Sequence, residues 1–255
     1  MWYFLPLEQT TPAPFHVNII LFSPPEVQLP LSCSDPRANH LLKILHRRPG
    51  DTFDAGLING SRGKGTLVAI GEHALTLTFS WGEPPPPLSP IHLLIGLTRP
   101  QTARDLLREM TSLGVAALHF VRTERGEASY ASSTLWRTDE WRTHIIHGAA
   151  QAFCTRLPEV THGRSLAEAA AALPADTHRF ALDNYEASAA LATCPLNSRP
   201  PVALALGAER GWSAAERAWL RNHQFTLVHL GARVLRTETA AIAAVALLKG
   251  RLGWL

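Results

Sequence analysis

The stretch LGARVLRTETAAIAAVALL, Leu230 to Leu248, decides the fold of the C-terminal part of the chain. It follows the run TLVHLG, whose apolar and β-branched residues favour a strand, and Gly231 ends that run. Thr237 and Glu238 then begin a long Ala/Leu-rich helix in the manner of an N-cap followed by an early acid. The sequence thus predicts the end of a strand, a turn and a long apolar helix.

The turn between that strand and that helix carries two arginines, Arg233 and Arg236. A helix start offers unpaired backbone N–H groups and the positive end of the helix dipole, which suit a carboxylate or a phosphate. An ordinary core helix needs neither arginine at this place. We therefore expect a functional site at this junction.

Composition is that of a folded protein with one large or two modest domains. The 255 residues are 46% apolar and 18% charged, which excludes a disordered chain. The net charge of +3 and the pI near 9.0 permit a polyanionic partner without requiring one. No apolar run reaches transmembrane length and the N-terminus lacks a basic n-region, so we expect a cytoplasmic protein without a membrane partner.

The cysteines and histidines do not predict a metal site. Cys33, Cys154 and Cys194 are scattered without a CxxC pair, which favours free thiols in a reducing cytosol. His144 and His147 stand three apart on a predicted helix, but no third ligand follows at metal spacing. We expect no bound metal.

The N-terminal part of the chain is rich in predicted strands. Residues 1–15 are expected to form a loose leader, and one short helix, Asn39 to Arg47, interrupts the strands 17–22, 51–58, 66–71 and 74–81. Several short strands in this space predict a small barrel. GSRGKGT (60–66) lacks phosphate-loop spacing and is expected at a hairpin tip, where Arg62 and Lys64 are placed to contact an RNA backbone.

The run EPPPPLSP, Glu83 to Pro90, marks a domain boundary because consecutive prolines favour an extended spacer. Strands and helices alternate after it. The predicted strands are 91–98, 115–121, 179–183, 201–207 and 225–231; the predicted helices are 103–113, 140–153, 166–173, one after 183, 213–221 and the C-terminal one. This alternation predicts a parallel sheet covered on both faces.

Ligands of such sheets bind at the carboxyl ends of the strands. We expect these ends at residues 98–99, 122–125, 206–211 and 230–236. In LGAERGWSAAE (206–216), glycines let a loop approach a ligand closely before a helix with a Ser213–Glu216 capping box. Two glycine-bearing strand ends are suited to hold one small molecule, although an ordinary turn explains 206–216 equally well.

Arginines also gather near these strand ends. Arg99, Arg122, Arg125 and Arg156 are candidates for phosphate contacts, while a single arginine of this kind is more often a solvated surface charge.

Five segments resemble, in order and spacing, the motifs of the SPOUT RNA methyltransferases of the RsmE type. They are HLLKILHRRPGD (40–51), TSLGVAALHFVRTER (111–125), AAQAFCTRLPEV (149–160), LGAERGWSAAE (206–216) and LGARVLRTETA (230–240). The last is matched essentially in full. The resemblance runs from about His16 to Leu252.

The resemblance implies a fold and a set of domains. The fold is α/β, with an N-terminal PUA-like β-barrel plus a C-terminal SPOUT α/β domain with a deep trefoil knot. The domains are a leader (1–15), the RNA-binding barrel (16–83), a proline-rich linker (84–90) and the methyltransferase domain (91–255). The resemblance also implies a homodimer with its active site at the subunit interface.

The implied activity is methylation of N3 of a uridine in small-subunit (16S) ribosomal RNA, with S-adenosylmethionine as cofactor and ribosomal RNA or the 30S subunit as partner. Matching positions place the cofactor against Leu206, Gly207, Glu209, Gly211, Leu230, Gly231, Val234, Leu235 and Arg236. RNA contacts are expected from Arg47, Arg62, Lys64, Arg99, Arg125 and Arg156.

The chemistry requires placement of the methyl donor and loss of the N3 proton. We expect the Arg236 guanidinium to stabilise the uridine anion, with Glu238 or water as proton acceptor.

The chain departs from the family's GPEGG loop, which is here Gly207-Ala208-Glu209-Arg210-Gly211. An alternative is therefore a divergent SPOUT-fold RNA-binding protein with a changed RNA target or weakened catalysis. Arg210 directed into the pocket favours that alternative, and Arg210 turned outward favours the enzyme. A non-RNA α/β enzyme rests on the sheet pattern alone.

Overall fold

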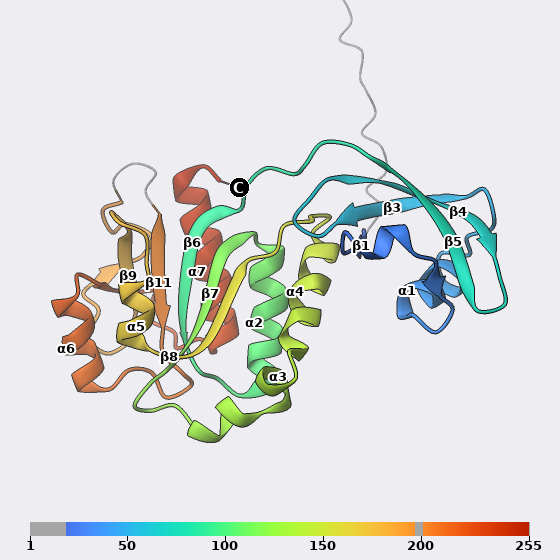
Figure 1. Ribbon diagram of the computed structural model, residues 1–255. Helices are drawn as coiled ribbons and strands as arrows, with labels where there is room; N and C mark the ends of the chain where they lie inside the picture. The colour runs from blue at the N-terminus through green and yellow to red at the C-terminus, as the bar shows by residue number, and fades with distance from the viewer. Residues whose placement is uncertain (1–18, 197–200, 255) are drawn as a thin grey trace, which may run out of the picture.

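A curled five-stranded sheet forms the first part of the computed structural model, which describes residues 19–196 and 201–254 (Figure 1). The predicted leader, residues 1–15, lies outside the described residues. The strand order is β1-β3-β4-β5-β2, with β1 parallel to β3 and the other pairs antiparallel. The strands are β1 (Ile20–Phe22), β2 (Leu31–Ser32), β3 (Thr52–Leu57), β4 (Arg62–Ile70) and β5 (Ala74–Trp81).

The short helix of this part begins earlier than predicted. Asp35 caps α1 (Pro36–Asn39) by accepting a 2.8 Å hydrogen bond from the Arg37 amide, and Pro36 supplies a preset first-turn φ angle. The chain continues as a π-helical turn, η2 (His40–Ile44), so the predicted helix 39–47 is wrong at both ends. A 3-10 turn, η1 (Glu26–Gln28), lies between β1 and β2.

A seven-stranded, wholly parallel sheet forms the second part, in the order β10-β12-β9-β11-β6-β7-β8. Its strands are β6 (Ser89–Gly96), β7 (Val115–Arg122), β8 (Glu159–Ser165), β9 (His178–Leu182), β10 (Ala189–Ala190), β11 (Val202–Leu206) and β12 (Thr226–His229). The predicted parallel sheet is confirmed. β6 begins inside the predicted linker, and the helix expected after residue 183 is wrong, because turns and β10 occupy residues 183–196.

Helices cover both faces of this sheet, as predicted. One face packs against α2 (Pro100–Ser112), α3 (Thr134–Arg137), α4 (Glu140–Gln151) and α7 (Thr237–Leu252). The other face packs against α5 (Leu166–Ala171) and α6 (Ala214–Asn222), while the 3-10 turn η3 (Ala128–Ser132) precedes α3. In α2 the residues Ala103, Leu106, Leu107 and Met110 recur at helical spacing and are all fully buried.

The five-stranded sheet packs against α4. Ile19 and Leu21 are buried against Ala149, and the Ile19 amide donates to the Ala150 carbonyl at 3.2 Å. Beyond α4, the Arg156 side chain donates to the carbonyls of Pro85 and Pro86, both at 3.0 Å. The two bonds tie the proline-rich segment to the loop between α4 and β8.

Cys33, Cys154 and Cys194 are free thiols, as expected. Among residues 19–196 and 201–254, none of the helices combines the length and the hydrophobicity that a membrane span requires.

Candidate active site

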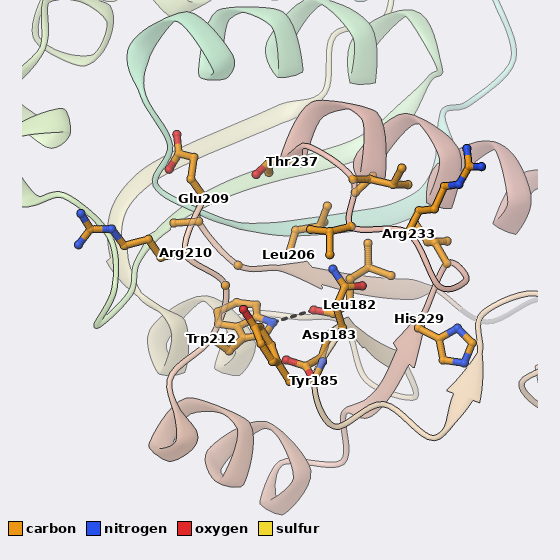
Figure 2. A pocket seen from close by; sticks show the side chains of 18 residues that line it. Leu182, Asp183, Tyr185, Leu206, Glu209, Arg210, Trp212, His229, Arg233 and Thr237 are labelled. Carbon is orange, nitrogen blue, oxygen red and sulfur yellow. Dashed lines mark hydrogen bonds between the residues drawn. The ribbon is translucent and has the colours of Figure 1, made fainter.

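A cavity of about 250 Å³ opens at the carboxyl ends of β9, β11 and β12, three neighbouring strands of the parallel sheet (Figure 2). We call it the strand-end pocket. It lies where parallel α/β sheets bind ligands. Its lining residues are 182–185, 206–212, 229–230, 233–235, 237 and 240.

The loop after β11 forms one wall, and its shape depends on glycine. A Cβ atom on Gly207 would lie 2.8 Å from the Gly211 Cα, so no other residue fits without moving the backbone. The Gly211 amide donates to the Ala208 carbonyl at 2.8 Å and closes the loop. The loop also passes over Gly96 of β6, where a Cβ would lie 2.4 Å from the Ala208 amide nitrogen.

Trp212 and the predicted capping box fix the C-terminal end of this loop. The fully buried Trp212 donates from Nε1 to the Leu182 carbonyl at 3.0 Å, which ties the loop to the end of β9. Ser213 and Glu216 form the expected reciprocal bonds at the start of α6. Glu216 also accepts from the Glu124 amide at 2.8 Å, so the residues after β7 are held too.

Glu209 lies at the pocket with its carboxylate turned toward the start of α2. Its Oε1 atom accepts a 2.8 Å hydrogen bond from the Arg99 amide and lies 3.7 Å from the Arg99 Nε atom. The Glu209 side chain therefore joins the pocket loop to a second strand end.

The loop after β12 forms the opposite wall and exposes apolar surface. Gly231, two residues after the end of β12, turns the chain with a φ of +108°, and Val234 is 82% exposed beside the cavity. Arg236 is the N-cap of α7 and makes no side-chain capping bond, so the prediction of Thr237 as N-cap is wrong by one residue. Thr237 and Ala240 line the pocket, so the positive end of α7 faces it.

Comparison with known proteins agrees with this geometry. Residues 84–249 match the family model described as an RNA methyltransferase domain. The chain is 36% identical over 239 residues to ribosomal RNA small subunit methyltransferase E (RsmE) of Treponema pallidum, covering 90% of each chain. The chain belongs to the RsmE family. It is also 27% identical over 230 residues to the Borreliella burgdorferi protein named ribosomal RNA small subunit methyltransferase E 1, covering 89% of this chain and 95% of that one.

Solved structures show that the RsmE fold is shared along nearly the whole chain. The Neisseria gonorrhoeae RsmE structure, described as bound to S-adenosyl methionine, has a TM-score of 0.73 at 23% identity and covers 91% of this chain and 98% of that one. A putative methyltransferase of Legionella pneumophila, described as a complex with the same cofactor, has a TM-score of 0.75 at 22% identity and covers 92% and 98%. The predicted family and enzyme class are confirmed.

The strand-end pocket brings together most of the residues that matching to RsmE proteins assigned to the cofactor. Those that line it are Leu206, Gly207, Glu209, Gly211, Leu230, Val234 and Leu235. Three further predicted residues do not line the cavity. Gly231 lies in the loop after β12, while Arg236 and Glu238 flank Thr237 at the start of α7.

The sequence interpretation missed a third wall, made by Asp183, Asn184 and Tyr185 after β9. The signal was present, because Asp183 ends the predicted strand 179–183 at the same sheet edge as the two motif loops. Burial would raise the pKa of Asp183, but hydrogen bonds from the Arg217 side chain and the Glu186 and Tyr185 amides lower it overall. Asp183 is thus a carboxylate in the folded chain.

The Arg210 side chain points away from the strand-end pocket (Figure 2). The backbone of Arg210 is held locally, because the Arg125 guanidinium donates to the Arg210 carbonyl at 3.2 Å. The replacement of a family glycine by Arg210 therefore leaves the cavity open, the outcome that favours an enzyme.

The six residues predicted to contact RNA do not lie in one place. Arg99 and Arg125 are exposed beside the pocket loop. Lys64 pairs with Asp54 across the β3–β4 ladder at 2.7 Å, and Arg62 donates to the Phe153 carbonyl at 3.4 Å. The remaining two are Arg156, held by the prolines, and Arg47, whose buried Nε atom has no bonding partner among the described residues.

Within residues 19–196 and 201–254, no three His, Cys, Asp or Glu side chains are grouped so as to hold a metal ion.

Proposed function

We propose that this chain binds S-adenosylmethionine in the strand-end pocket and methylates N3 of a uridine in small-subunit ribosomal RNA. One observation carries the proposal: the loops 206–211 and 230–235, which follow the strands β11 and β12, form two walls of a single cavity. The chain's relatives are named ribosomal RNA small subunit methyltransferases.

The lining fits the chemistry of this cofactor. Leu182, Leu206, Leu230 and Leu235 supply apolar surface for a purine, while the backbone of the glycine loops offers polar groups at close range. The start of α7 supplies N–H groups and a positive dipole end for the cofactor carboxylate. When bound, the cofactor supplies a methyl group on a sulfonium.

The chain's own contribution is placement and charge. The Glu209–Arg99 bond and the Trp212–Leu182 bond hold two walls of the pocket before a ligand arrives. The exposed Arg236 guanidinium stands at the start of α7, where it would stabilise the anion left when the uridine loses its N3 proton. Glu238, the second residue of the same helix, or water would accept that proton.

The remaining family features belong to this proposal. We assign a PUA-like barrel to the five-stranded sheet (16–83), a linker at 84–90 and a knotted SPOUT domain at 91–255. The active form would be a cytoplasmic homodimer, and the 82% exposed Val234 beside the cavity supports a site that a second subunit completes. RNA would approach along Arg99 and Arg125, two exposed arginines that donate hydrogen bonds to the pocket loop.

Calorimetric titration with S-adenosylmethionine, followed by methyl transfer to 30S subunits lacking the modification, tests the function. Saturable binding near one cofactor per chain and a new 3-methyluridine support it. Binding of RNA without cofactor binding or transfer would instead establish the alternative, an RNA-binding relative without catalysis. The outward Arg210 side chain favours the enzyme between these two.

A further inference from the structure

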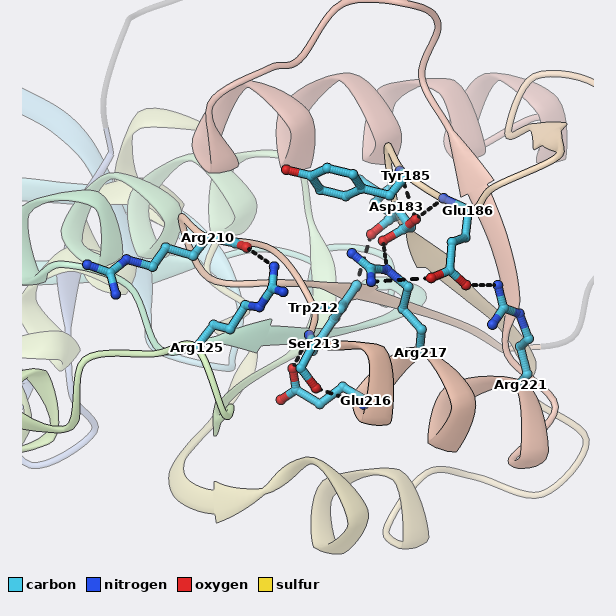
Figure 3. Close-up of polar contacts among 11 residues, drawn as sticks. Arg125, Asp183, Tyr185, Glu186, Arg210, Trp212, Ser213, Glu216, Arg217 and Arg221 are labelled. Carbon is cyan, nitrogen blue, oxygen red and sulfur yellow. Dashed lines mark hydrogen bonds and ion pairs between the residues drawn. The ribbon is translucent and has the colours of Figure 1, made fainter.

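The Tyr185 ring lies on the rim of the strand-end pocket and is 76% exposed, although it is a large aromatic side chain (Figure 3). Its backbone is firmly held. The Asp183 Oδ1 atom accepts hydrogen bonds from the amides of Tyr185 at 2.9 Å and Glu186 at 2.6 Å. These two bonds fix the backbone that carries the ring.

Arg217, a buried arginine of α6, bonds the same loop. The Arg217 Nε atom donates to Asp183 Oδ2 at 2.7 Å, and the exposed fractions of the two side chains are 7% and 2%. The guanidinium carbon of Arg217 lies 5.0 Å from the centroid of the Tyr185 ring. Arg217 also donates to the Glu186 carboxylate at 3.3 Å, so it contacts three residues of one loop.

This arrangement leaves the ring with one occupied side and one free surface. Arg217 packs against the ring and is attracted to its π electrons. The Cε2 edge of the ring lies near Gly211, where a Cβ atom would be 4.0 Å from it. A large exposed ring beside leucines and a glycine loop is suited to stack on a planar group, since aromatic pairs gain energy beyond the area they bury.

We propose that Tyr185 contacts the adenine of S-adenosylmethionine and that Arg217, through Asp183, is the residue that positions it. The inference rests on the proposed function. It adds the loop after β9 to the cofactor site, beside the two motif loops after β11 and β12. Adenine is preferred over the sulfonium because the Arg217 cation already occupies one side of the ring. A ligand that covers the ring also removes its exposed apolar surface from water.

Titration calorimetry with S-adenosylmethionine and with S-adenosylhomocysteine, which lacks the positive charge, tests the Tyr185 contact. We expect Tyr185→Ala to raise both dissociation constants by roughly fivefold to tenfold and Tyr185→Phe to stay within about twofold of the wild type. Unchanged constants for Tyr185→Ala would overturn the contact. A loss confined to the charged ligand would also overturn it, because the ring would then face the sulfonium.

A spectroscopic measurement places the contact at the ring itself. The chain has three tyrosines, so protein labelled with 3-fluorotyrosine gives few ¹⁹F resonances, and the one missing in Tyr185→Phe belongs to Tyr185. Cofactor addition should shift that resonance through the purine ring current and leave Tyr130, outside the pocket lining, in place. A Tyr185 resonance that does not move on saturation would contradict the proposal.

Arg217→Gln tests the positioning role, with Arg221→Gln as its matched control. Arg221 lies on the same helix and bonds Glu186, and among the described residues it makes no hydrogen bond or ion pair with Asp183 or Tyr185. Arg217→Gln should shift the Tyr185 resonance before any ligand is added and weaken cofactor binding, with partial rescue by Arg217→Lys. Arg221→Gln should do neither. Equal effects of the two variants would overturn the role.

The outcomes separate this inference from the proposed function. Wild-type protein that binds neither ligand refutes the cofactor site itself. If the wild-type protein and the Tyr185→Ala variant bind both ligands equally well, only the proposed contact between Tyr185 and adenine is refuted. Because Tyr185 is exposed, its variants should fold even if Arg217→Gln does not.

Discussion

The backbone amide of Arg99 donates a 2.8 Å hydrogen bond to the Glu209 carboxylate, which joins the start of α2 to the pocket loop after β11. The two residues are 110 positions apart in the chain. This bond holds the loop from outside the cavity, so Glu209 shapes the pocket without its carboxylate having to touch the ligand.

Glu209→Ala should therefore weaken cofactor binding while the fold survives. A hydrogen bond of this kind contributes about 1 kcal/mol, which corresponds to a dissociation constant roughly fivefold higher. Calorimetric titration measures the change. Glu209→Gln keeps an acceptor for the Arg99 amide and should bind within about twofold of the wild type. A Glu209→Ala variant that binds like the wild type would show that the loop needs no such support.

Gly207→Ala should abolish cofactor binding far more completely than Gly231→Ala. The added Cβ at Gly207 meets backbone atoms of Gly211 at 2.8 and 2.9 Å, so the loop must move. At Gly231 nothing lies within 4 Å, and only the φ of +108° opposes an alanine, at about 1–2 kcal/mol. Calorimetric titration compares the cofactor affinities of the two variants, and thermal unfolding checks that both are folded. Equal losses of affinity would mean that strain, not the close approach, governs the loop.

The larger sheet could be predicted because its local patterns are strong. β11 (Val202–Leu206) is buried along its whole length and was recognised from an uninterrupted apolar run. The start of α6 followed from the Ser213–Glu216 capping box, which forms as expected. These features are encoded within a few residues of sequence, so no tertiary information is needed to find them.

The parts that could not be predicted depend on distant partners. β8 (Glu159–Ser165) is an edge strand with polar, largely exposed residues, and only its pairing with β7 makes it a strand. The turn after β9 forms because Asp183 accepts the Tyr185 and Glu186 amides, while its other oxygen is bonded by Arg217, 34 residues away. The third wall of the pocket follows from that pairing and was missed.

His119 should make the folded state less stable as the pH falls below 6.5. Burial, with the neighbouring His92, lowers the pKa of His119 from 6.5 to about 4 against the opposing effect of Glu159. Between these pH values His119 binds a proton in the unfolded chain but not in the folded chain. Up to about 3 kcal/mol of stability is therefore lost. Urea unfolding at a series of pH values measures this.

His119→Gln keeps a partner for Thr161, which lies 2.8 Å from the His119 ring, and should flatten the decline of stability between pH 6.5 and 4. His73→Gln, at a side chain 88% exposed, is the control and should behave like the wild type. A decline that is as steep in His119→Gln as in the wild type would assign the effect to other groups.

Arg236→Ala should fold and bind cofactor normally but lose turnover. The side chain is exposed and lies outside the pocket lining, so its removal costs neither packing nor a cofactor wall. If its guanidinium stabilises the uridine anion, methyl transfer under single-turnover conditions should slow by about a hundredfold or more. Arg137→Ala, an exposed arginine on α3, should transfer at the wild-type rate. Normal turnover by Arg236→Ala would move the charge-stabilising role to Arg233, the other arginine of the loop and a lining residue of the pocket.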